Sequence, residues 1–243
     1  MNIQNNNFYT PQFTSKLNPI NPTVIRTKYG KLNLREVRKA DLANPKFLEK
    51  LSKFYCANFS ACTDDPSWIM YNTVPKRIKN QMIENFVSYL RHIIKNDDGN
   101  MTLLLAKDKR SKIQGACLSY GYDLVDGSKD YILYVDSIAV NKTFRGAKLG
   151  KKMMQKTIEA NKDNSSFTDV FLVGEKRALG FYKKLGFVNL IKKDPAQCKV
   201  SNFIALDRED YPKYVDFLTL PLKPKQPRWY SKIAQKISDT WIF

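Results

Sequence analysis

Residues 131–152, YILYVDSIAVNKTFRGAKLGKK, constrain the fold more than any other segment. The apolar, β-branched run over residues 131–140 predicts a buried strand, and a short turn with Gly146 and Gly150 leads into a helical pattern. A strand that feeds such a turn and a helix N-terminus forms an anion site. Unpaired backbone N–H groups converge there, and the helix dipole adds partial positive charge. The sequence therefore predicts a ligand that carries phosphate.

The charge balance favours anionic partners. The chain of 243 residues has 41 Lys and Arg against 23 Asp and Glu, a net charge of +18. Phosphorylated cofactors, nucleic acid, acidic proteins and an anionic membrane face all fit that charge, and so does a soluble protein from a lysine-rich proteome. The four cysteines show no CxxC or Cys/His ligand spacing, so we expect no metal site.

The compartment is predicted from what the sequence lacks. No apolar run approaches the roughly 20 residues that span a bilayer. The N-terminus has no basic segment followed by an apolar one, so it does not resemble a secretory signal. Scattered cysteines in a chain of this length are typical of a reducing cytoplasm, and we expect a cytoplasmic protein.

Hydrophobic periodicity predicts an α+β fold, in which a central, mostly antiparallel sheet carries helices on both faces. Strands are predicted near 32–37, and over 101–107, 113–122, 131–140, 170–173, 187–191 and 203–206. Helices are predicted from an N-cap at Asp41 or Asn44, and over 75–95, 146–161 and 178–185, with Gly186 as a C-cap.

Two tails are predicted to flank the domain of residues 31–210. Residues 1–30 are rich in Asn and Pro, which predicts a disordered or loosely docked arm. Residues 211–243 read as a proline-containing linker and an amphipathic C-terminal helix, with Trp229 and Trp241 on one stripe. That helix either docks on the core or on a second copy in a homodimer, or lies on an anionic membrane as a peripheral contact.

Two segments, VNKTFRGAKLGKKMM and VGEKRALGFYKKLGFV, carry a family resemblance. Together they resemble the GNAT superfamily of acyl-CoA-dependent N-acetyltransferases. The first family signature is Arg/Gln-x-x-Gly-x-Gly/Ala after a V-shaped central strand, and the second is Asn-x-x-Ala-x-x-hydrophobic-Tyr followed by Gly-Phe. The matching positions here are Arg145 and Gly150, and then Ala178, Phe181, Tyr182, Gly186 and Phe187.

Two positions depart from the family pattern. Lys148 stands where the first signature has its middle glycine, which normally lets the backbone approach the pyrophosphate. A lysine there keeps the loop geometry if its φ is ordinary, and it adds a cation near phosphate, but the change also fits weaker cofactor binding. Glu175 stands where the second signature has asparagine, which puts a polar contact to the pantetheine arm in doubt.

The resemblance implies acetyl-CoA as co-substrate. Its pyrophosphate would bind N–H groups of residues 145–151, and its pantetheine arm would pair with the strand edge at Ile138 and Val140. One of these two N–H groups would stabilise the oxyanion, and Tyr182 would protonate the departing thiolate. The cofactor-binding residues so implied are Ile138, Ala139, Val140, Arg145, Gly146, Ala147, Lys148, Leu149, Gly150, Lys151 and Glu175.

The sequence leaves alternatives open for the roles of the expected catalytic residues. Asp136 is the expected general base, because it has the same strand parity as Ile138 and Val140. It also reads as a carboxylate at a bulge or turn, paired with a lysine, and Tyr134 and Asp123 are substitutes for the role. Tyr182 also reads as a core tyrosine between helix and strand.

The acceptor is expected to be a primary amine on a small molecule or protein. It would lie over the first helices and the 60–75 loop, where aromatic side chains form a wall or simply pack: Tyr55, Phe59, Trp68 and Tyr71. The competing hypothesis is a degenerate GNAT-like module that binds an acidic partner or nucleic acid. Nucleic acid is not favoured, because the lysines are spread and no RNA-binding signature is present.

Overall fold

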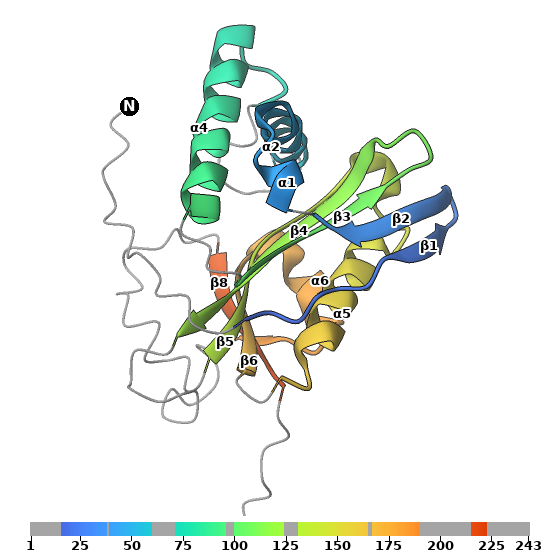
Figure 1. Cartoon of the computed structure of the whole chain (residues 1–243). Helices are drawn as coiled ribbons and strands as arrows, with labels where there is room; N and C mark the ends of the chain where they lie inside the picture. Colours follow the sequence, from blue (N-terminus) through green and yellow to red (C-terminus); the bar gives the residue numbers. More distant parts are fainter. Residues whose placement is uncertain are drawn as a thin grey trace, which may run out of the picture.

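An eight-stranded sheet in the order β1-β2-β3-β4-β5-β6-β8-β7 forms the centre of the molecule (Figure 1). The computed structural model describes residues 16–37, 39–59, 71–95, 100–123, 131–164, 167–189 and 215–222. The strands are β1 (Thr23–Thr27), β2 (Gly30–Glu36), β3 (Met101–Lys107), β4 (Ile113–Asp123), β5 (Tyr131–Val140), β6 (Phe167–Glu175), β7 (Val188–Asn189) and β8 (Val215–Pro221).

Neighbouring strands pair antiparallel except β5 and β6, which are parallel. A parallel pair needs a crossover connection, and helix α5 (Leu149–Asn161) supplies it. The predicted mostly antiparallel α+β sheet is confirmed.

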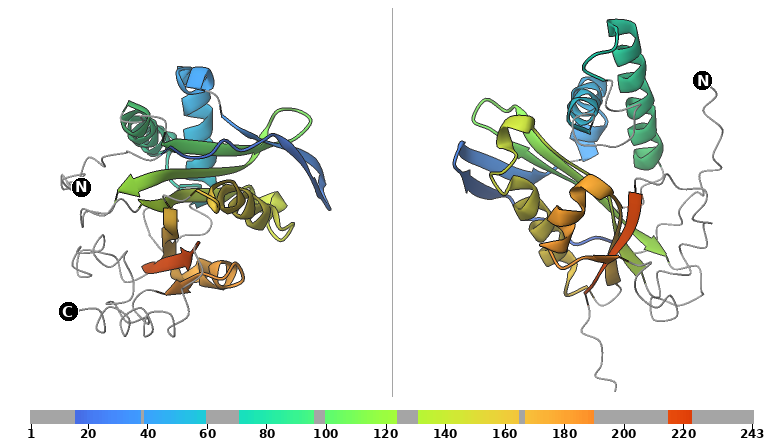
Figure 2. Two further views of the ribbon diagram at one scale, coloured as in Figure 1. Left: turned by 60° about the horizontal axis from the view of Figure 1, so that its bottom comes forward. Right: turned by 180° about the vertical axis from the view of Figure 1, so that it is seen from behind.

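Helices cover both faces of this sheet, as predicted. Figures 1 and 2 show α1 (Lys39–Leu42), α2 (Pro45–Phe59) and α4 (Lys76–Lys95) on one face. The other face carries α5 and α6 (Leu179–Lys183). Two 3-10 turns, η1 (Lys142–Phe144) and η2 (Lys176–Ala178), precede α5 and α6.

Each face has its own hydrophobic core. Along β3, Leu103 and Leu105 pack under α2 and α4, whereas Leu104 and Ala106 pack on the α5 side. This alternation follows from the two-residue period of a strand. Because both faces are covered, β3 reads as a continuous apolar run rather than an alternating one.

The ordered domain begins earlier than the expected Lys31. Strand β1 lies inside the segment 1–30 that was predicted to be a loosely docked arm, and it pairs with β2. Ile20 and Ile25 are buried, and the Asn18 side chain donates to the Ala160 carbonyl at 2.8 Å. The prediction failed because Asn and Pro dilute the apolar pattern, although two isoleucines suffice to anchor the hairpin. Residues 1–15 lie outside the described part.

The C-terminal segment also differs from the prediction. Strand β8 falls within 211–243, predicted as linker and helix, and it lies between β6 and β7. Phe217 and Leu218 are 3% and 1% exposed, so this strand is buried on both faces. The prolines of this segment suggested a linker, but Pro221 is the last residue of the strand, where proline is tolerated. The predicted strand at 203–206 and the predicted C-terminal helix lie outside the described residues.

Most element boundaries agree with the predictions. Asn44 caps α2, its side chain accepting from the Lys46 N–H at 3.0 Å. Helix α6 ends at Lys183, earlier than predicted, and Gly186 lies in the turn that follows it, with φ +92°. In the ranges that the structure describes, no helix has the length and apolar character needed to cross a membrane.

Candidate functional site

A β-bulge at Asp136 organises the centre of β5. On β4, Leu118 and Ser119 are consecutive, but they pair with Ser137 and Val135, so Asp136 is the extra residue. Beyond the bulge the faces exchange: Val135 and Ile138 both belong to the α5-side core, and Ala139 to the α2-side core. The predicted common parity of Asp136 with Ile138 and Val140 is therefore wrong, because one inserted residue reverses the alternation.

The first consequence is where Asp136 points. Its carboxylate accepts hydrogen bonds from Tyr120 of β4, at 2.9 Å, and from Tyr89 of α4. It thus faces the α2 and α4 side, where the acceptor was expected. The sequence also allowed Asp136, as an alternative, to be a carboxylate at a bulge or turn that is paired with a lysine. The bulge is confirmed, but the carboxylate is hydrogen-bonded to two tyrosines instead of a lysine.

A gap between β5 and β6 is the second consequence. Their parallel pairing extends only from Tyr131 to Tyr134 on β5, although both strands continue. The Asn141 N–H donates to Gln114 O on β4 at 2.9 Å. Since backbone groups alternate in an antiparallel ladder, those of Ile138 and Val140 face away from β4, towards the gap.

Backbone donors gather at the start of α5. This helix has no side-chain N-cap, and its first backbone bond runs from Lys152 N–H to Lys148 O at 3.0 Å. The N–H groups of its first turn therefore point beyond the helix end. Within the predicted segment 145–151, two N–H groups are already bonded: Arg145 donates to Lys142 O and Ala147 to Phe144 O, both at 3.2 Å. The predicted anion cradle is thus narrower than seven residues.

Lys148 adopts the left-handed conformation, with φ +60° and ψ +14°. The condition stated for lysine, an ordinary φ, is therefore not met, because the loop retains the backbone shape that glycine favours. Gly146, two residues earlier, also has a positive φ of +74°. The loop geometry is therefore kept, at the expense of strain at Lys148.

The side chain of Arg145 bonds to carbonyl oxygens on two elements. It donates to Asn58 O at the end of α2, at 2.9 Å, and to Val140 O at the end of β5, at 3.3 Å. It therefore ties the last turn of α2 to the strand that borders the gap. Its positive charge lies beside the α5 N-terminus, together with the exposed Lys148 and Lys151.

Helix α6 borders the gap from the α5 face. The Phe181 ring lies 3.5 Å from the position a Cβ on Gly150 would take, and Val140 lies 3.4 Å from it. Tyr182 is 8% exposed and packs edge-on against Phe181 and Phe187. Its ring also covers Gly174 of β6, where a Cβ would come within 3.2 Å. These contacts fit the core reading of Tyr182 and also position it beside the gap.

Burial and hydrogen bonding act in opposite directions on Asp136. Burial raises the pKa of its carboxyl above the ordinary value, and hydroxyl donors, Tyr89 foremost, lower it by less. Burial and the negative charge of Asp136 raise the pKa of Tyr89, so its phenol stays a neutral donor. Tyr89 and Tyr120 were missed from the sequence. The available signal was Tyr89 three residues after Phe86, on the apolar stripe of α4.

Aromatic rings surround this carboxylate. The ring centroid of Tyr55 lies 5.2 Å from that of Phe59 and 5.1 Å from that of Phe86. The ring centroids of Phe86 and Tyr89 are 5.5 Å apart. Tyr120 lies 5.2 Å from Tyr134 across the strand pair. Tyr55 is fully buried in the α2-side core and Phe59 packs against it, which is the packing alternative of the prediction. Tyr71 is a buried member of the same core, and Trp68 falls outside the described residues.

The remaining predicted residues are dispersed. Glu175 ends β6 and precedes η2, Tyr134 is half-buried beside Tyr120, and Asp123 ends β4. No cluster of metal-binding side chains occurs in the part of the chain that the structure describes.

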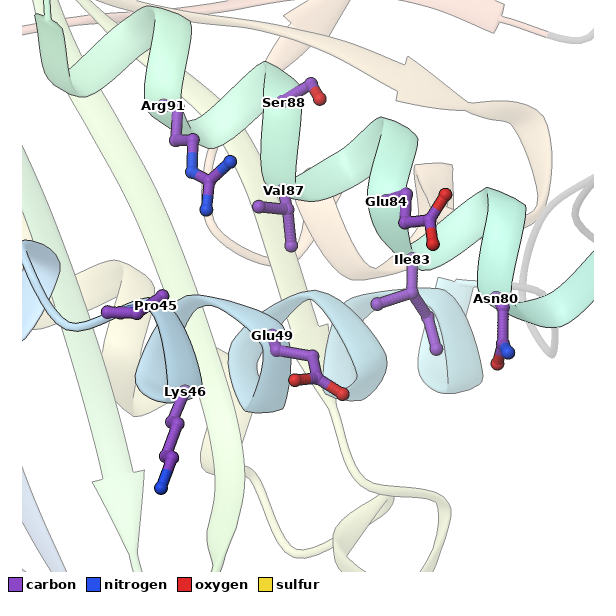
Figure 3. Close-up of a pocket in the computed structure, with 9 residues that line it drawn as sticks. All are labelled: Pro45, Lys46, Glu49, Asn80, Ile83, Glu84, Val87, Ser88 and Arg91. Carbon is purple, nitrogen blue, oxygen red and sulfur yellow. The ribbon is translucent and has the colours of Figure 1, made fainter.

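A separate groove lies between α2 and α4 (Figure 3). It carries charges of both signs, from Glu49 and Glu84 and from Lys46 and Arg91. None of the predicted site residues lines it, so we place the functional site at the β5–β6 gap instead.

Comparison with known proteins points to one family. Residues 99–189 match the family model described as "Acetyltransferase (GNAT) domain". This span includes strand β5, helix α6 and the turn that precedes α5. These three elements border the gap. No curated protein matches the sequence.

Several solved structures are similar overall. PaiA N-acetyltransferase from Thermoplasma acidophilum, in complex with coenzyme A, is 12% identical with a TM-score of 0.48, over 78% of this chain and 98% of its own. A GNAT-family acetyltransferase from Staphylococcus aureus is 19% identical with a TM-score of 0.47, over 79% and 99%. A histone acetyltransferase HPA2-related protein from Corynebacterium glutamicum is 19% identical with a TM-score of 0.49, over 84% and 99%.

Replacing Asp136 with asparagine is expected to stabilise the protein at neutral pH. A carboxyl whose folded-state pKa is raised binds its proton more tightly when folded. The free energy of unfolding therefore falls as pH rises from about 4 through the folded-state pKa. Asp136→Asn removes this fall and keeps an oxygen acceptor for both tyrosines. Urea unfolding across acidic to neutral pH measures the effect, with Asp163→Asn, at an exposed carboxyl, as the control. A variant less stable at neutral pH than wild type contradicts the prediction.

Lys148→Gly is expected to raise the free energy of unfolding by up to about 1 kcal/mol, since glycine adopts a positive φ without the steric cost. Lys151→Gly is the matched control, because it removes the same charge from the same helix end at a helical position. That variant is expected to lose up to about 1 kcal/mol. Equal losses in both variants would show that the φ of Lys148 carries no strain.

Proposed function

We propose that this chain, a member of the GNAT superfamily through its residues 99–189, transfers an acetyl group from acetyl-CoA to a primary amine. The observation that carries the proposal is the gap between β5 and β6. Backbone groups of Ile138 and Val140 face it, and the uncapped N-terminus of α5 lies at its end. Backbone groups of β5 for an amide-containing arm are therefore followed, along the gap, by backbone N–H donors of α5 for phosphate.

The residues present fit this co-substrate. The N–H groups of Lys148, Leu149 and Gly150 would hold the pyrophosphate, helped by the α5 dipole. The side chains of Lys148 and Lys151 add positive charge there. Backbone groups of Ile138 and Val140 would pair with the pantetheine amides as a neighbouring strand would. Ala139 contributes by pairing with Ala116 of β4, which holds this edge in place. The other residues of the predicted set, Gly146, Ala147 and Glu175, border this path.

Acetyl-CoA, when bound, supplies an activated thioester. Asp136 would accept a proton from the acceptor ammonium, directly or through water, and leave a neutral amine to attack the carbonyl carbon. The N–H of Ile138 or Val140 would stabilise the oxyanion as it forms. Tyr182 would donate its phenol proton to the departing sulfur. It would regain a proton from the attacking nitrogen, which loses its second proton as the tetrahedral adduct collapses to the amide. A tyrosine, with an ordinary pKa of about 10, remains protonated at neutral pH and can act as this acid.

The chain's charge bears on the acceptor. A net charge of +18 repels polybasic acceptors at the encounter, so we propose a small amine or an amine on a neutral or acidic macromolecule. Aromatic rings around Asp136 suit the apolar part of such an acceptor.

Calorimetry with acetyl-CoA tests the proposal directly. We expect a dissociation constant below about 1 mM, the upper end of the usual range for enzyme substrates. Gly180→Ala is a suitable control, because a Cβ there meets no atom within 4 Å. An absence of binding at millimolar acetyl-CoA would overturn the enzyme assignment in favour of a GNAT-like binding module for an acidic partner.

Tyr182→Phe tests the proposed acid. Phenylalanine keeps the ring contacts with Gly174, Phe181 and Phe187, so affinity for acetyl-CoA should be unchanged. Loss of a general acid lowers kcat by about 10²- to 10⁴-fold. A screen of primary amines with thiol release as readout supplies the assay. An unchanged kcat would assign Tyr182 to packing alone.

A further inference from the structure

We infer that Tyr89 and Tyr120 are positioning residues for Asp136: they hold its Oδ1 atom and reserve Oδ2 to receive the acceptor's proton. The inference rests on the proposed function, in which Asp136 is the base. Both tyrosines lie outside the motifs of the family resemblance, on α4 and β4.

The geometry separates the two carboxylate oxygens. The phenol of Tyr89 and the phenol of Tyr120 both donate to Oδ1. Neither tyrosine donates to Oδ2, and the further hydroxyl beside the carboxylate among the described residues is that of the neighbouring Ser137. Two donors from two elements fix the plane of the carboxylate, because each restrains rotation about the same side-chain torsion. One oxygen is thus committed to the protein, and the other keeps its lone pairs.

The bulge makes this arrangement possible. Asp136 is the unpaired residue of β5 opposite Leu118 and Ser119, so its side chain turns to the face where Tyr120 stands. Helix α4 crosses the same face and brings Tyr89 from 47 residues away in the chain. Three elements therefore converge on one oxygen atom.

Neutral donors suit a base better than a cation would. A lysine or arginine beside the carboxylate would lower its pKa strongly and weaken it as a proton acceptor. Tyrosines lower the pKa only by hydrogen bonding, and burial opposes them. The carboxylate is thus held in place while its pKa stays above the ordinary value, which favours its role as a proton acceptor.

No formal charge of either sign accompanies Asp136 among the described groups that face it. Burial keeps the Tyr55 and Tyr89 phenols protonated, and it raises the pKa of the Cys117 thiol to about 12. The groups that face Asp136 are Tyr55 from α2, Tyr89 from α4, Tyr120 from β4, and Tyr134 and Ser137 from β5. The Cys117 thiol of β4 is near but belongs to the α5-side core, where it contacts Thr157. An acceptor ammonium that reaches Asp136 therefore meets one negative charge surrounded by neutral groups.

The proton transfer balances simply. The acceptor ammonium gives one proton to Oδ2, which leaves a neutral amine and a neutral carboxyl. After acetyl transfer the carboxyl returns that proton to water. Neither tyrosine changes its protonation state, so each acts only through the carboxylate.

Tyr89→Phe tests the inference through the pH dependence of kcat/KM. A hydrogen bond to a charged group contributes about 1.5–3 kcal/mol, so its loss should move the acid limb upward by about 1–2 pH units. Tyr120→Phe should move the limb in the same direction. Tyr71→Phe is the matched control: it removes a buried phenol from the same core, and the limb should stay in place. An acid limb unmoved in both Tyr89→Phe and Tyr120→Phe would overturn the inference.

A second readout does not need turnover. Carbon-13 NMR of the Asp136 carboxyl, identified by its loss in Asp136→Asn, reports its pKa in the resting protein. We expect that pKa to rise in Tyr89→Phe. If the chain binds acetyl-CoA but transfers no acetyl group, the proposed function fails while this titration still tests the tyrosines. If the carboxyl pKa rises and the acid limb of an active enzyme does not follow, Asp136 is not the base and the inference is overturned.

Discussion

The bulge at Asp136 is the constraint on which the site depends. One extra residue in β5 exchanges the faces of the strand, so that Asp136 points towards α4 while Ile138, two residues later, packs on the α5 side. The same irregularity accompanies the end of pairing with β6 after Tyr134. A regular strand would have continued the parallel ladder and closed the gap. The local loss of hydrogen bonds in the sheet is thus what leaves backbone donors available to a ligand.

The turn between β5 and α5 holds this opening in shape. The guanidinium of Arg145 reaches the carbonyls of Asn58 and Val140, so the end of α2 and the end of β5 are fixed together. Close packing of α5 on the sheet adds to this. A Cβ on Gly115 would come within 2.6 Å of the Met153 sulfur, which shows how near the helix lies to β4. The position of the α5 N-terminus is therefore fixed by the packing of α5 on β4 and by the hydrogen bonds of Arg145.

Much of the fold was predictable because hydrophobic periodicity is a local property. Strand β5 and helix α4 follow directly from their apolar patterns. The parity of Asp136 was not predictable, because a bulge depends on the register with β4, and no residue near Asp136 marks it. Strand β8 was missed because its apolar run stands among prolines and between segments without periodicity. The pattern of the turn predicted an anion site, but the φ of Lys148 had to come from the structure.

Asp136 and Tyr182 lie on opposite faces of the sheet. Asp136 belongs to the face covered by α2 and α4, and Tyr182 to the face covered by α5 and α6. The open edge of β5 lies between them. A base must act on the incoming amine and an acid on the leaving sulfur, and these two atoms lie on different sides of the carbonyl carbon. In the proposed function, a sheet with a carboxylate on one face, a phenol on the other and backbone N–H groups between them would separate these tasks.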